Sequence, residues 1–221
     1  MLTLFTVIAL SYLIGSIPTS ILVGRVLRGI DIREVGSKNA GATNVYRVLG
    51  LGPALFVGIV DGAKGAAAVL LISRIAVGEV ALDPGLIQIA AGMSVVAGHI
   101  WTVFAGFRGG RGVMTAAGAW IALAPIPVLI AVGVWCILTF STGYVSVGSI
   151  SAAAVLPIAL FVGRFGLGAE ISNALLGFGC VVGGLLILRH RANIGRLLRG
   201  EENRFGKRGK TSKPFTTESH G

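Results

Sequence analysis

The stretch that decides the fold is residues 112–140, GVMTAAGAWIALAPIPVLIAVGVWCILTF. Its 29 residues include no charged side chain, and the run Pro125-Ile126-Pro127 interrupts it near the middle. Because a transmembrane helix needs about 20 mostly apolar residues, the stretch forms either one long span or two shorter spans that turn at the prolines. This choice decides whether the chain has six spans or seven, and on which side of the membrane its C-terminus lies.

The rest of the chain has the composition of a membrane-embedded protein. Of its 221 residues, 54% are hydrophobic and 13% are charged, and the mean hydropathy is +0.85. A soluble domain has roughly 25% charged residues. Further apolar runs lie at about residues 2–23, 51–77, 86–107, 144–162 and 171–188. We predict an all-α integral membrane protein with a single domain over residues 1–200 and a basic, disordered cytoplasmic tail over residues 201–221.

The distribution of Lys and Arg separates the two topologies, because cytoplasmic loops of membrane proteins collect these residues. With seven spans, the loop of residues 24–50, the loop near residues 105–112 and the tail all face the cytoplasm and hold 16 of the 19 basic residues. With six spans, the nine basic residues of the tail lie outside and seven remain inside. We therefore predict seven transmembrane helices, with the N-terminus outside, the C-terminus cytoplasmic, and residues 112–124 as a short fourth span.

The same distribution explains the formal net charge of +10 without nucleic acid as a partner. Against this basic background, two glycine-rich polar segments stand on the predicted cytoplasmic side, GSKNAGATNVYRVLG at 36–50 and AGFRGGRGV at 105–113. Glycine exposes backbone N–H groups, which bind phosphate oxygens at helix N-termini, and arginine adds a bidentate fork. Two such segments on one face predict a site for two phosphate groups.

Several isolated polar residues have two interpretations. Asp61 and Lys64 are spaced i, i+3 and form either an internal ion pair or, for Lys64, a substrate contact in a polar cavity. His99 lies in an apolar context and provides either a hydrogen bond between helices or a functional group. His190 and Asn193 share a helix face, which favours a common ligand. Because no metal-ligand spacing and no nucleotide-binding fingerprint is found, we predict neither a metal nor a cofactor.

Six segments occur in the order that is typical of one known family. They are GSIPTSILVGR (15–25), GSKNAGATNVYRVLG (36–50), DGAKG (61–65), GHIWTVFAGFRGGRGVMTAAG (98–118), YVSVGSI (144–150) and HRANIGRLLRGEENRFG (190–206). Together they resemble the bacterial acylphosphate–glycerol-3-phosphate acyltransferases of the PlsY type, over about residues 11–206. Such enzymes have seven spans.

The resemblance implies transfer of a fatty acyl group from acyl phosphate, not acyl-CoA, to the 1-hydroxyl of glycerol 3-phosphate. The products are lysophosphatidic acid and phosphate, in the first acylation of phospholipid synthesis. It implies a multi-pass protein of the bacterial inner (plasma) membrane, in contact with membrane lipid and with a cytoplasmic active site. Functional coupling to an enzyme that produces acyl phosphate follows from the nature of the donor.

The motifs and the resemblance together nominate Ser37 and His99 as catalytic residues. The substrate-binding residues they nominate are Gly36, Asn39, Gly41, Ala42, Thr43, Asn44, Arg47, Lys64, Gly109, Gly110, Arg111, Gly112, Ser146, Ser149, His190 and Asn193. The chain departs from the family pattern at Ala40, where proline is usual, at Arg111, where lysine is usual, and at Gly143, where a basic residue is frequent. These departures bear on substrate geometry and leave the class of reaction unchanged.

Three mechanisms fit an acyl phosphate donor. His99 removes the proton of the glycerol hydroxyl, acting through Ser37 or directly; or the protein positions both substrates and the donor's own phosphate takes the proton; or Ser37 forms a covalent acyl intermediate. We favour the second hypothesis, because no carboxylate stands beside His99 in the sequence to orient it.

Two other classes of protein would also have apolar spans with polar loops. A small-anion transporter or exchanger is the main alternative. Its substrate site would lie near the middle of the membrane, whereas the polar segments here gather on one side, and the two halves show no internal repeat. A non-catalytic lipid-binding scaffold would leave both phosphate-binding segments without a role.

Overall fold

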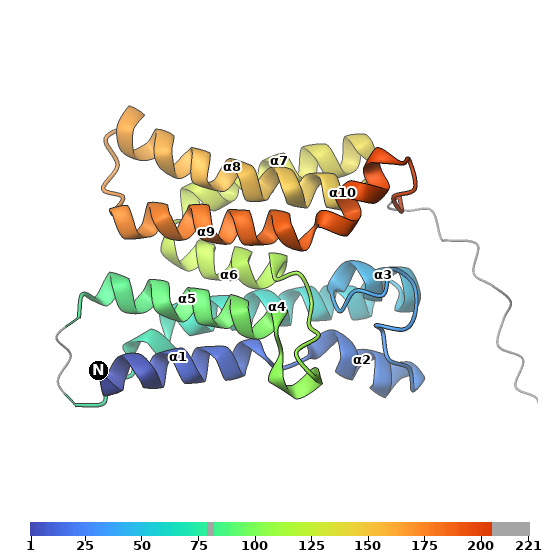
Figure 1. Ribbon diagram of the computed structural model, residues 1–221, viewed down its shortest axis with the longest axis horizontal. Helices are drawn as coiled ribbons and strands as arrows, with labels where there is room; N and C mark the ends of the chain where they lie inside the picture. Colours follow the sequence, from blue (N-terminus) through green and yellow to red (C-terminus); the bar gives the residue numbers. More distant parts are fainter. Residues whose placement is uncertain (79–81, 205–221) are drawn as a thin grey trace, which may run out of the picture.

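The computed structural model describes residues 1–78 and 82–204. All regular secondary structure in these residues is helical, and the long helices lie side by side along the longest axis of the molecule (Figure 1). Two short 3-10 helices, η1 (Ile72–Arg74) and η2 (Val103–Ala105), join them. The α-helices are α1 (Leu2–Gly15), α2 (Thr19–Arg28), α3 (Ala42–Leu49), α4 (Leu51–Leu70), α5 (Pro84–Ile100), α6 (Val113–Leu123), α7 (Pro125–Thr142), α8 (Val145–Gly166), α9 (Asn173–Arg189) and α10 (Arg191–Leu198).

Length and hydropathy identify the segments that can cross a membrane. Within the described residues, five qualify: Leu2–Arg28, Leu51–Arg74, Pro84–Ala105, Pro125–Thr142 and Val145–Gly166. The pair α9 and α10, bent by 53°, makes a sixth if it is counted as one span. Helix α6 is apolar but has only 11 residues. The chain is therefore a multi-pass membrane protein, and its described residues are helical in all their regular structure, as the sequence predicts.

The stretch 112–140 forms two helices rather than one. Helix α6 ends at Leu123 and α7 begins at Pro125, so the turn lies at the prolines as predicted. Proline suits the first turn of a helix because its missing N–H has no intrahelical partner there. Helix α6 packs along α4 in the middle of the bundle, and α7 packs along α8 (Figure 1). At a rise of about 1.5 Å per residue, α6 covers only about half of a hydrocarbon core of roughly 30 Å.

The first predicted span, residues 2–23, is interrupted. Helix α1 ends at Gly15 and α2 begins at Thr19, because Pro18 cannot donate a hydrogen bond to the preceding turn. The carbonyl groups freed by this break find partners elsewhere in the bundle. That of Ile17 accepts a hydrogen bond from Nζ of Lys64 at 2.7 Å, and that of Ser16 accepts one from the hydroxyl of Thr102. Lys64 of α4 and Thr102, just before η2, thus hold the break in place.

Helices α4 and α6 approach closely through glycine. A Cβ atom at Gly65 would overlap the backbone carbonyl of Thr115, and one at Gly118 would overlap the backbone of Gly62. In a membrane, where the surrounding lipid is as apolar as the side chains, such close backbone contact is a main source of helix association. The core nearby includes the stacked rings of Trp120 and Phe178, whose centroids are 4.7 Å apart. The short helix α6 is therefore anchored by packing on several sides.

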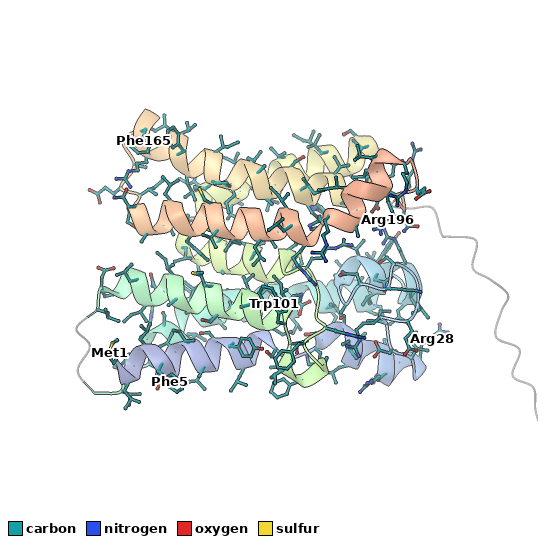
Figure 2. The ribbon with its side chains drawn as sticks, in the orientation of Figure 1. Met1, Phe5, Arg28, Trp101, Phe165 and Arg196 are labelled. Atoms are coloured by element: carbon teal, nitrogen blue, oxygen red, sulfur yellow. The ribbon has the colours of Figure 1, made fainter. Side chains whose placement is uncertain are left out.

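Basic side chains mark one end of the bundle. Arg28 and Arg196 lie at the end where α2, α3 and α10 gather, whereas Met1 and Phe165 lie at the opposite end (Figure 2). Most of the predicted tail, residues 205–221, lies outside the described residues. The described part, residues 201–204, follows α10, and the side chain of Glu202 within it is buried.

Candidate active site

The loop before α3 is shaped by the side chain of Asn44. Its Oδ1 atom accepts a hydrogen bond from the backbone N–H of Ser37 at 2.7 Å. Its Nδ2 atom donates to the carbonyls of Ile32 at 2.8 Å and Val35 at 3.0 Å. Asn44 is fully buried, and Gly36 beside it has a φ of 60°, with no room for a Cβ atom against the Asn44 amide. This network fixes the backbone at Ser37.

The second glycine-rich loop connects η2 to α6. The N–H of Gly109 donates to the carbonyl of Ile100 at 3.1 Å, and the N–H of Gly110 donates to the carbonyl of His99 at 3.2 Å. A Cβ atom at Gly110 would overlap the ring of His99 and the carbonyl of Ala40. The sequence predicts amides free for phosphate at these two glycines. The structure corrects that prediction, because both amides hold the loop against the end of α5.

The free helix ends lie instead at the starts of α3 and α6. The N-cap residues are Gly41 and Gly112, and neither helix has a side-chain cap. The first N–H groups of a helix lack intrahelical partners and carry a partial positive charge, so an uncapped N-terminus favours an anion. Gly41, Ala42 and Thr43 of one helix end, and Gly112 and Val113 of the other, line the same cavity.

This cavity, which we call the cleft, holds about 340 Å³ of free space. Its polar part is formed by the loops before α3 and α6 and by residues of α8 and of the α9–α10 junction. Its apolar part runs along α4, where Leu51, Leu55 and Ile59 follow one another at helical spacing and are 59%, 55% and 70% exposed. In a membrane-spanning chain this apolar wall faces lipid, so the cleft joins its polar end to the bilayer.

Arginine side chains surround the polar end of the cleft. Burial lowers the pKa of Arg111 to about 10, and the guanidinium groups of Arg196 and Arg47 act in the same direction. Burial also lowers the pKa of Arg47. Burial destabilises the charged form of a guanidinium because it removes hydrating water. A bound anion stabilises that charged form again, because it replaces the hydrogen bonds and the favourable electrostatics of the lost water. The polar end of the cleft is therefore suited to a phosphate.

A buried carboxylate, Glu202, closes this end. Its Oε1 atom accepts hydrogen bonds from the hydroxyl of Ser146 at 3.0 Å and from Nδ2 of Asn193 at 2.6 Å. Its Oε2 atom accepts one from Nε of Arg196 at 2.8 Å. Among the described residues, Oδ1 of Asn193 has no hydrogen-bond partner, although the atom is buried and the side chain lines the cleft. Glu202 thus orients Asn193 so that an acceptor is left for a ligand.

The two histidines approach the cleft from different elements. Nδ1 of His190 lies 2.7 Å from the carbonyl of Leu186 and donates to it, which leaves Nε2 as the free ring nitrogen. Nδ1 of His99 lies 3.1 Å from Oγ1 of Thr115 and 3.8 Å from Oδ1 of Asp61. A neighbouring carboxylate, absent from the local sequence, therefore reaches His99 from α4 in the folded chain.

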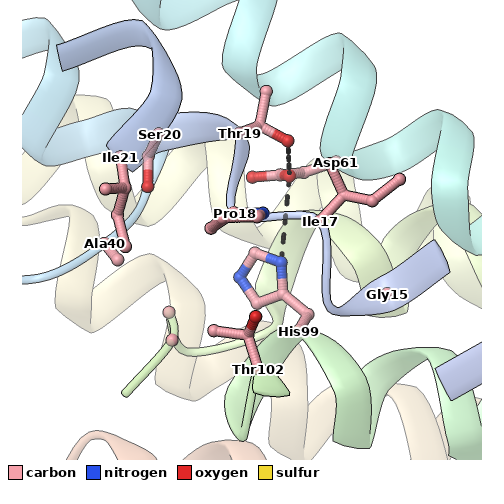
Figure 3. Close-up of a pocket in the computed structure, with 12 residues that line it drawn as sticks. Gly15, Ile17, Pro18, Thr19, Ser20, Ile21, Ala40, Asp61, His99 and Thr102 are labelled. Carbon is pink, nitrogen blue, oxygen red and sulfur yellow. Dashed lines mark hydrogen bonds and ion pairs between the residues drawn. The ribbon is translucent and has the colours of Figure 1, made fainter. Parts of the chain in front are cut away.

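Asp61 itself belongs to a buried cluster with Thr19 and Lys64; Figure 3 shows its contacts with Thr19 and His99. Its Oδ1 atom accepts hydrogen bonds from Oγ1 of Thr19 at 3.0 Å and from Nζ of Lys64 at 2.8 Å. Nζ of Lys64 also contacts the hydroxyl of Thr19 and the carbonyl of Ile17. The cluster encloses a small cavity of about 10 Å³ beside His99, about enough for one water molecule. For Lys64, the structure favours the internal ion pair over the substrate contact.

Most of the nominated residues meet at the cleft. Those that line it are Ser37, Asn39, Gly41, Ala42, Thr43, Arg47, His99, Arg111, Gly112, Ser146, Ser149, His190 and Asn193. The remaining five are placed otherwise. Asn44 and Gly36 shape the Ser37 loop, Lys64 holds the α1–α2 break, and Gly109 and Gly110 line only the small cavity.

Four charged or aromatic residues of the cleft were not nominated from the sequence. Asp61 was considered only as the partner of Lys64, and its distance to His99 is a tertiary contact. Glu202 stands in the segment assigned to the tail. Tyr46 and Trp135 read as ordinary hydrophobic positions, although Nε1 of Trp135 donates to Oγ of Ser149 at 3.2 Å. The pair of carboxylates Glu201 and Glu202 within a basic segment was the available signal, and only the structure shows that Glu202 is the buried one.

Comparison with known proteins identifies the family of this chain. The sequence model of the family described as glycerol-3-phosphate acyltransferase matches residues 5–200. The chain belongs to the glycerol-3-phosphate acyltransferase family. Its relatives include the glycerol-3-phosphate acyltransferase of Chlorobaculum parvum, 46% identical over 94% of this chain and 100% of that protein. Another is that of Chlorobium phaeobacteroides, 45% identical over 92% of this chain and 97% of the relative.

Solved structures agree with the assignment to the acyltransferase family. The crystal structure of PlsY, an integral membrane glycerol 3-phosphate acyltransferase, in its glycerol 3-phosphate form superimposes with a TM-score of 0.80. It is 35% identical, and the match covers 93% of this chain and 96% of that one. The lysophosphatidic acid form of PlsY gives a TM-score of 0.78 at 34% identity. The acyltransferase described here therefore shares both sequence and fold with PlsY.

Proposed function

We propose that this acyltransferase moves a fatty acyl group from acyl phosphate to the 1-hydroxyl of glycerol 3-phosphate, forming lysophosphatidic acid and inorganic phosphate. The observation that carries the proposal is the shape of the cleft. One end has two uncapped helix N-termini and two arginines, and the other is an apolar wall along α4. A substrate with a phosphate head and an acyl chain fits this division, and the second helix end leaves room for the phosphate of the acceptor.

The reaction exchanges one bond to the acyl carbon for another. The glycerol hydroxyl oxygen attacks the acyl carbon, the bond between that carbon and the phosphate oxygen breaks, and the hydroxyl proton passes to the departing phosphate. Because the donor is already activated, positioning and fixed positive charge supply most of the acceleration. The α3 and α6 N-termini, Arg47 and Arg111 are proposed to hold the two phosphates, and Asn193 Oδ1 to accept from a glycerol hydroxyl.

The donor phosphate remains the proposed proton acceptor. Asp61 is the carboxylate that could orient His99, but its Oδ1 atom is already engaged by Lys64 and Thr19, and it lies 3.8 Å from the imidazole. The Lys64 ammonium and the Thr19 hydroxyl therefore compensate most of the negative charge of Asp61, which weakens its electrostatic effect on the His99 imidazole. In this proposal His99 packs the Gly109–Gly110 loop and borders the cleft, and Ser37 contacts substrate rather than forming an acyl intermediate.

The membrane arrangement is proposed on the basis of charge and helix length. We propose seven spans with α6 as a short fourth span, the N-terminus outside and the C-terminus cytoplasmic. Residues 1–200, together with Glu202, form one domain, followed by a basic tail. The cleft then opens at the cytoplasmic side of a bacterial inner membrane, where an enzyme that produces acyl phosphate supplies the donor. The support is that Arg28 and Arg196 lie at the same end of the bundle, opposite Met1 and Phe165 (Figure 2).

The test is turnover by the purified chain in detergent micelles with acyl phosphate and labelled glycerol 3-phosphate. Lysophosphatidic acid should form in the absence of any sealed compartment, which a transporter would need. Acyl-CoA in place of acyl phosphate should give no product. Product formation from acyl-CoA alone would overturn the proposed donor, and lack of product from either donor would overturn the proposed activity.

The proton acceptor is tested by His99→Ala in the same assay. If the donor phosphate takes the proton, kcat should fall by about tenfold or less, since general-base catalysis typically contributes about 100-fold to 10,000-fold. Circular dichroism and the melting temperature in detergent confirm that the variant is folded. A fall of about 100-fold or more, within the range of a general-base contribution, would instead make His99 the base.

A further inference from the structure

One arginine outside the cleft joins the two loops that line it. Nη1 of Arg33 donates to the carbonyl of Ala105 at 2.8 Å and to the carbonyl of Arg108 at 3.2 Å. Arg33 belongs to the loop between α2 and α3, whereas Ala105 and Arg108 belong to the loop between α5 and α6. The two loops are more than seventy positions apart in the sequence, and the guanidinium of Arg33 bridges them directly.

The guanidinium is held in place from its own side by Asp31. Nε of Arg33 lies 3.0 Å from Oδ1 of Asp31, and Nη2 lies 2.7 Å from Oδ2, so the pair is bidentate. The backbone N–H of Arg33 also donates to Oδ1 at 2.9 Å. Hydrogen bonds from Arg33 lower the pKa of Asp31, so the carboxylate is charged at neutral pH. A bidentate arginine pair has little freedom, and Nη1 is therefore aimed at the second loop.

Both ends of this bridge lead directly into the cleft. On one side, the Asn44 side chain holds the carbonyls of Ile32 and Val35, which flank Arg33, and also holds the N–H of Ser37. On the other side, Arg108 is followed by Gly109 and Gly110, fixed by their hydrogen bonds to the end of α5, and then by Arg111. Rigid connections thus run from Arg33 to a cleft residue in each loop.

We propose that Arg33 is a positioning residue that sets the separation between the Ser37 loop and the Arg111 loop, and hence the distance at which the two phosphorylated substrates face each other. The inference rests on the proposed function of the cleft. The hydrogen bonds of Arg33 go to Asp31, Ala105 and Arg108 and not to either helix N-terminus, so we expect each phosphate site to survive without it. What changes without Arg33 is the alignment of donor and acceptor, which is a property of the ternary complex.

The kinetic test compares Arg33→Ala with the wild-type chain in micelles. We expect kcat to fall at least tenfold, while KM for acyl phosphate and KM for glycerol 3-phosphate each change by less than threefold. Arg33→Lys keeps an ionic contact with Asp31 but lacks the fork, so its kcat should be intermediate. Arg25→Gln is the matched control, because Arg25 also lies near Asp31, at 3.9 Å, and its side chain is 64% exposed. Its kinetics should equal those of the wild type.

A second measurement does not need turnover. Spin labels at Lys38→Cys and Arg108→Cys, in a chain with Cys136 and Cys180 replaced by serine, report the distance between the loops. Arg33→Ala should broaden that distance distribution, and Arg25→Gln should leave it unchanged. If Arg33→Ala does not fold, Asp31→Asn takes its place in both measurements, because it frees the guanidinium without removing it.

The proposal is overturned if kcat of the folded variant stays within twofold of wild type, if either KM rises while kcat is kept, or if the spin-label distribution does not change. Lack of turnover by the wild-type chain would instead refute the function proposed for the cleft. The spin-label distances would then still decide whether Arg33 sets the spacing of the loops.

Discussion

At the scale of single residues, Arg111 lines the cleft, and we propose that it binds a substrate phosphate. Arg111→Gln should raise KM for a phosphorylated substrate by about 10-fold to 100-fold, since a hydrogen bond to a charged group is worth about 1.5–3 kcal/mol. Arg111→Lys keeps the charge, and its KM should stay within about threefold of wild type. Steady-state kinetics in micelles measure both. Arg28→Gln, at the exposed end of α2, is the control, and an equal effect from Arg28 would mean that net charge rather than Arg111 binds the phosphate.

Asn44 illustrates a residue that supports the cleft without entering it. Asn44→Ala removes three hydrogen bonds to buried backbone groups, which should cost about 2–4 kcal/mol. For a chain of this size, the apparent melting temperature in detergent should fall by roughly 5–10 °C. Asn173→Ala, exposed at the start of α9, should leave the melting temperature unchanged. A stable Asn44→Ala that only weakens substrate binding would show that Asn44 contacts substrate after all.

Which residues the sequence identifies depends on whether their partners are local. Arg47 and Arg111 are predicted because glycine and arginine recur within short polar loops, whereas Ser37 is nominated through the family resemblance. Asp61 was assigned to Lys64 alone, because its contact with His99 spans the packing of α4 against α5 and α6. The amides of Gly109 and Gly110 were predicted to be free, but whether an N–H is free depends on the carbonyls that the fold brings near. Composition gives the chemistry of a site, whereas tertiary contacts decide which atoms remain available.

At the scale of elements, the packing of α4 against α6 depends on the absence of a side chain. Gly65→Ala should lower the apparent melting temperature and the yield of folded protein, because its Cβ atom would overlap the carbonyl of Thr115 in a backbone that cannot give way. Gly177→Ala in α9 is the matched control, since a Cβ atom there meets nothing within 4 Å. Its melting temperature should be equal or slightly higher. Equal loss in both variants would indicate that glycine matters for flexibility rather than for close approach.

The two helix breaks differ in how well the sequence predicts them. Two closely spaced prolines at 125 and 127 in a stretch too long for one span make the turn between α6 and α7 readable. A single proline, Pro18, is compatible with either a kinked helix or a broken one. The sequence predicts one span over residues 2–23, whereas the structure has a break at this proline. The outcome is a break because Lys64 and Thr102, both distant in sequence, satisfy the carbonyls that it exposes.

At the scale of the whole molecule, the proposed topology makes a prediction about sidedness. Single cysteines at Lys38 and Arg199 should react with an impermeant maleimide only from the cytoplasmic side, and single cysteines at Arg74 and Glu170 only from the outside. All four variants use the chain without Cys136 and Cys180. Labelling in right-side-out and inverted vesicles measures the difference. The proposed topology places an even number of spans between Lys38 and Arg199. Reaction of these two positions from opposite sides would require an odd number of spans between them and would therefore exclude the proposed topology.

The exposed row of Leu51, Leu55 and Ile59 on α4 has a consequence for how this catalyst meets its reactants. If the donor enters the cleft by lateral diffusion in the membrane, the concentration that governs its binding is its amount per unit of membrane area. The concentrations that govern the acceptor and the released phosphate are their amounts per volume of water. Adding inert lipid at constant total volume should therefore slow the reaction although no bulk concentration has changed. The rate of this acylation would then depend on the surface concentration of the acyl donor in the membrane rather than on its total concentration.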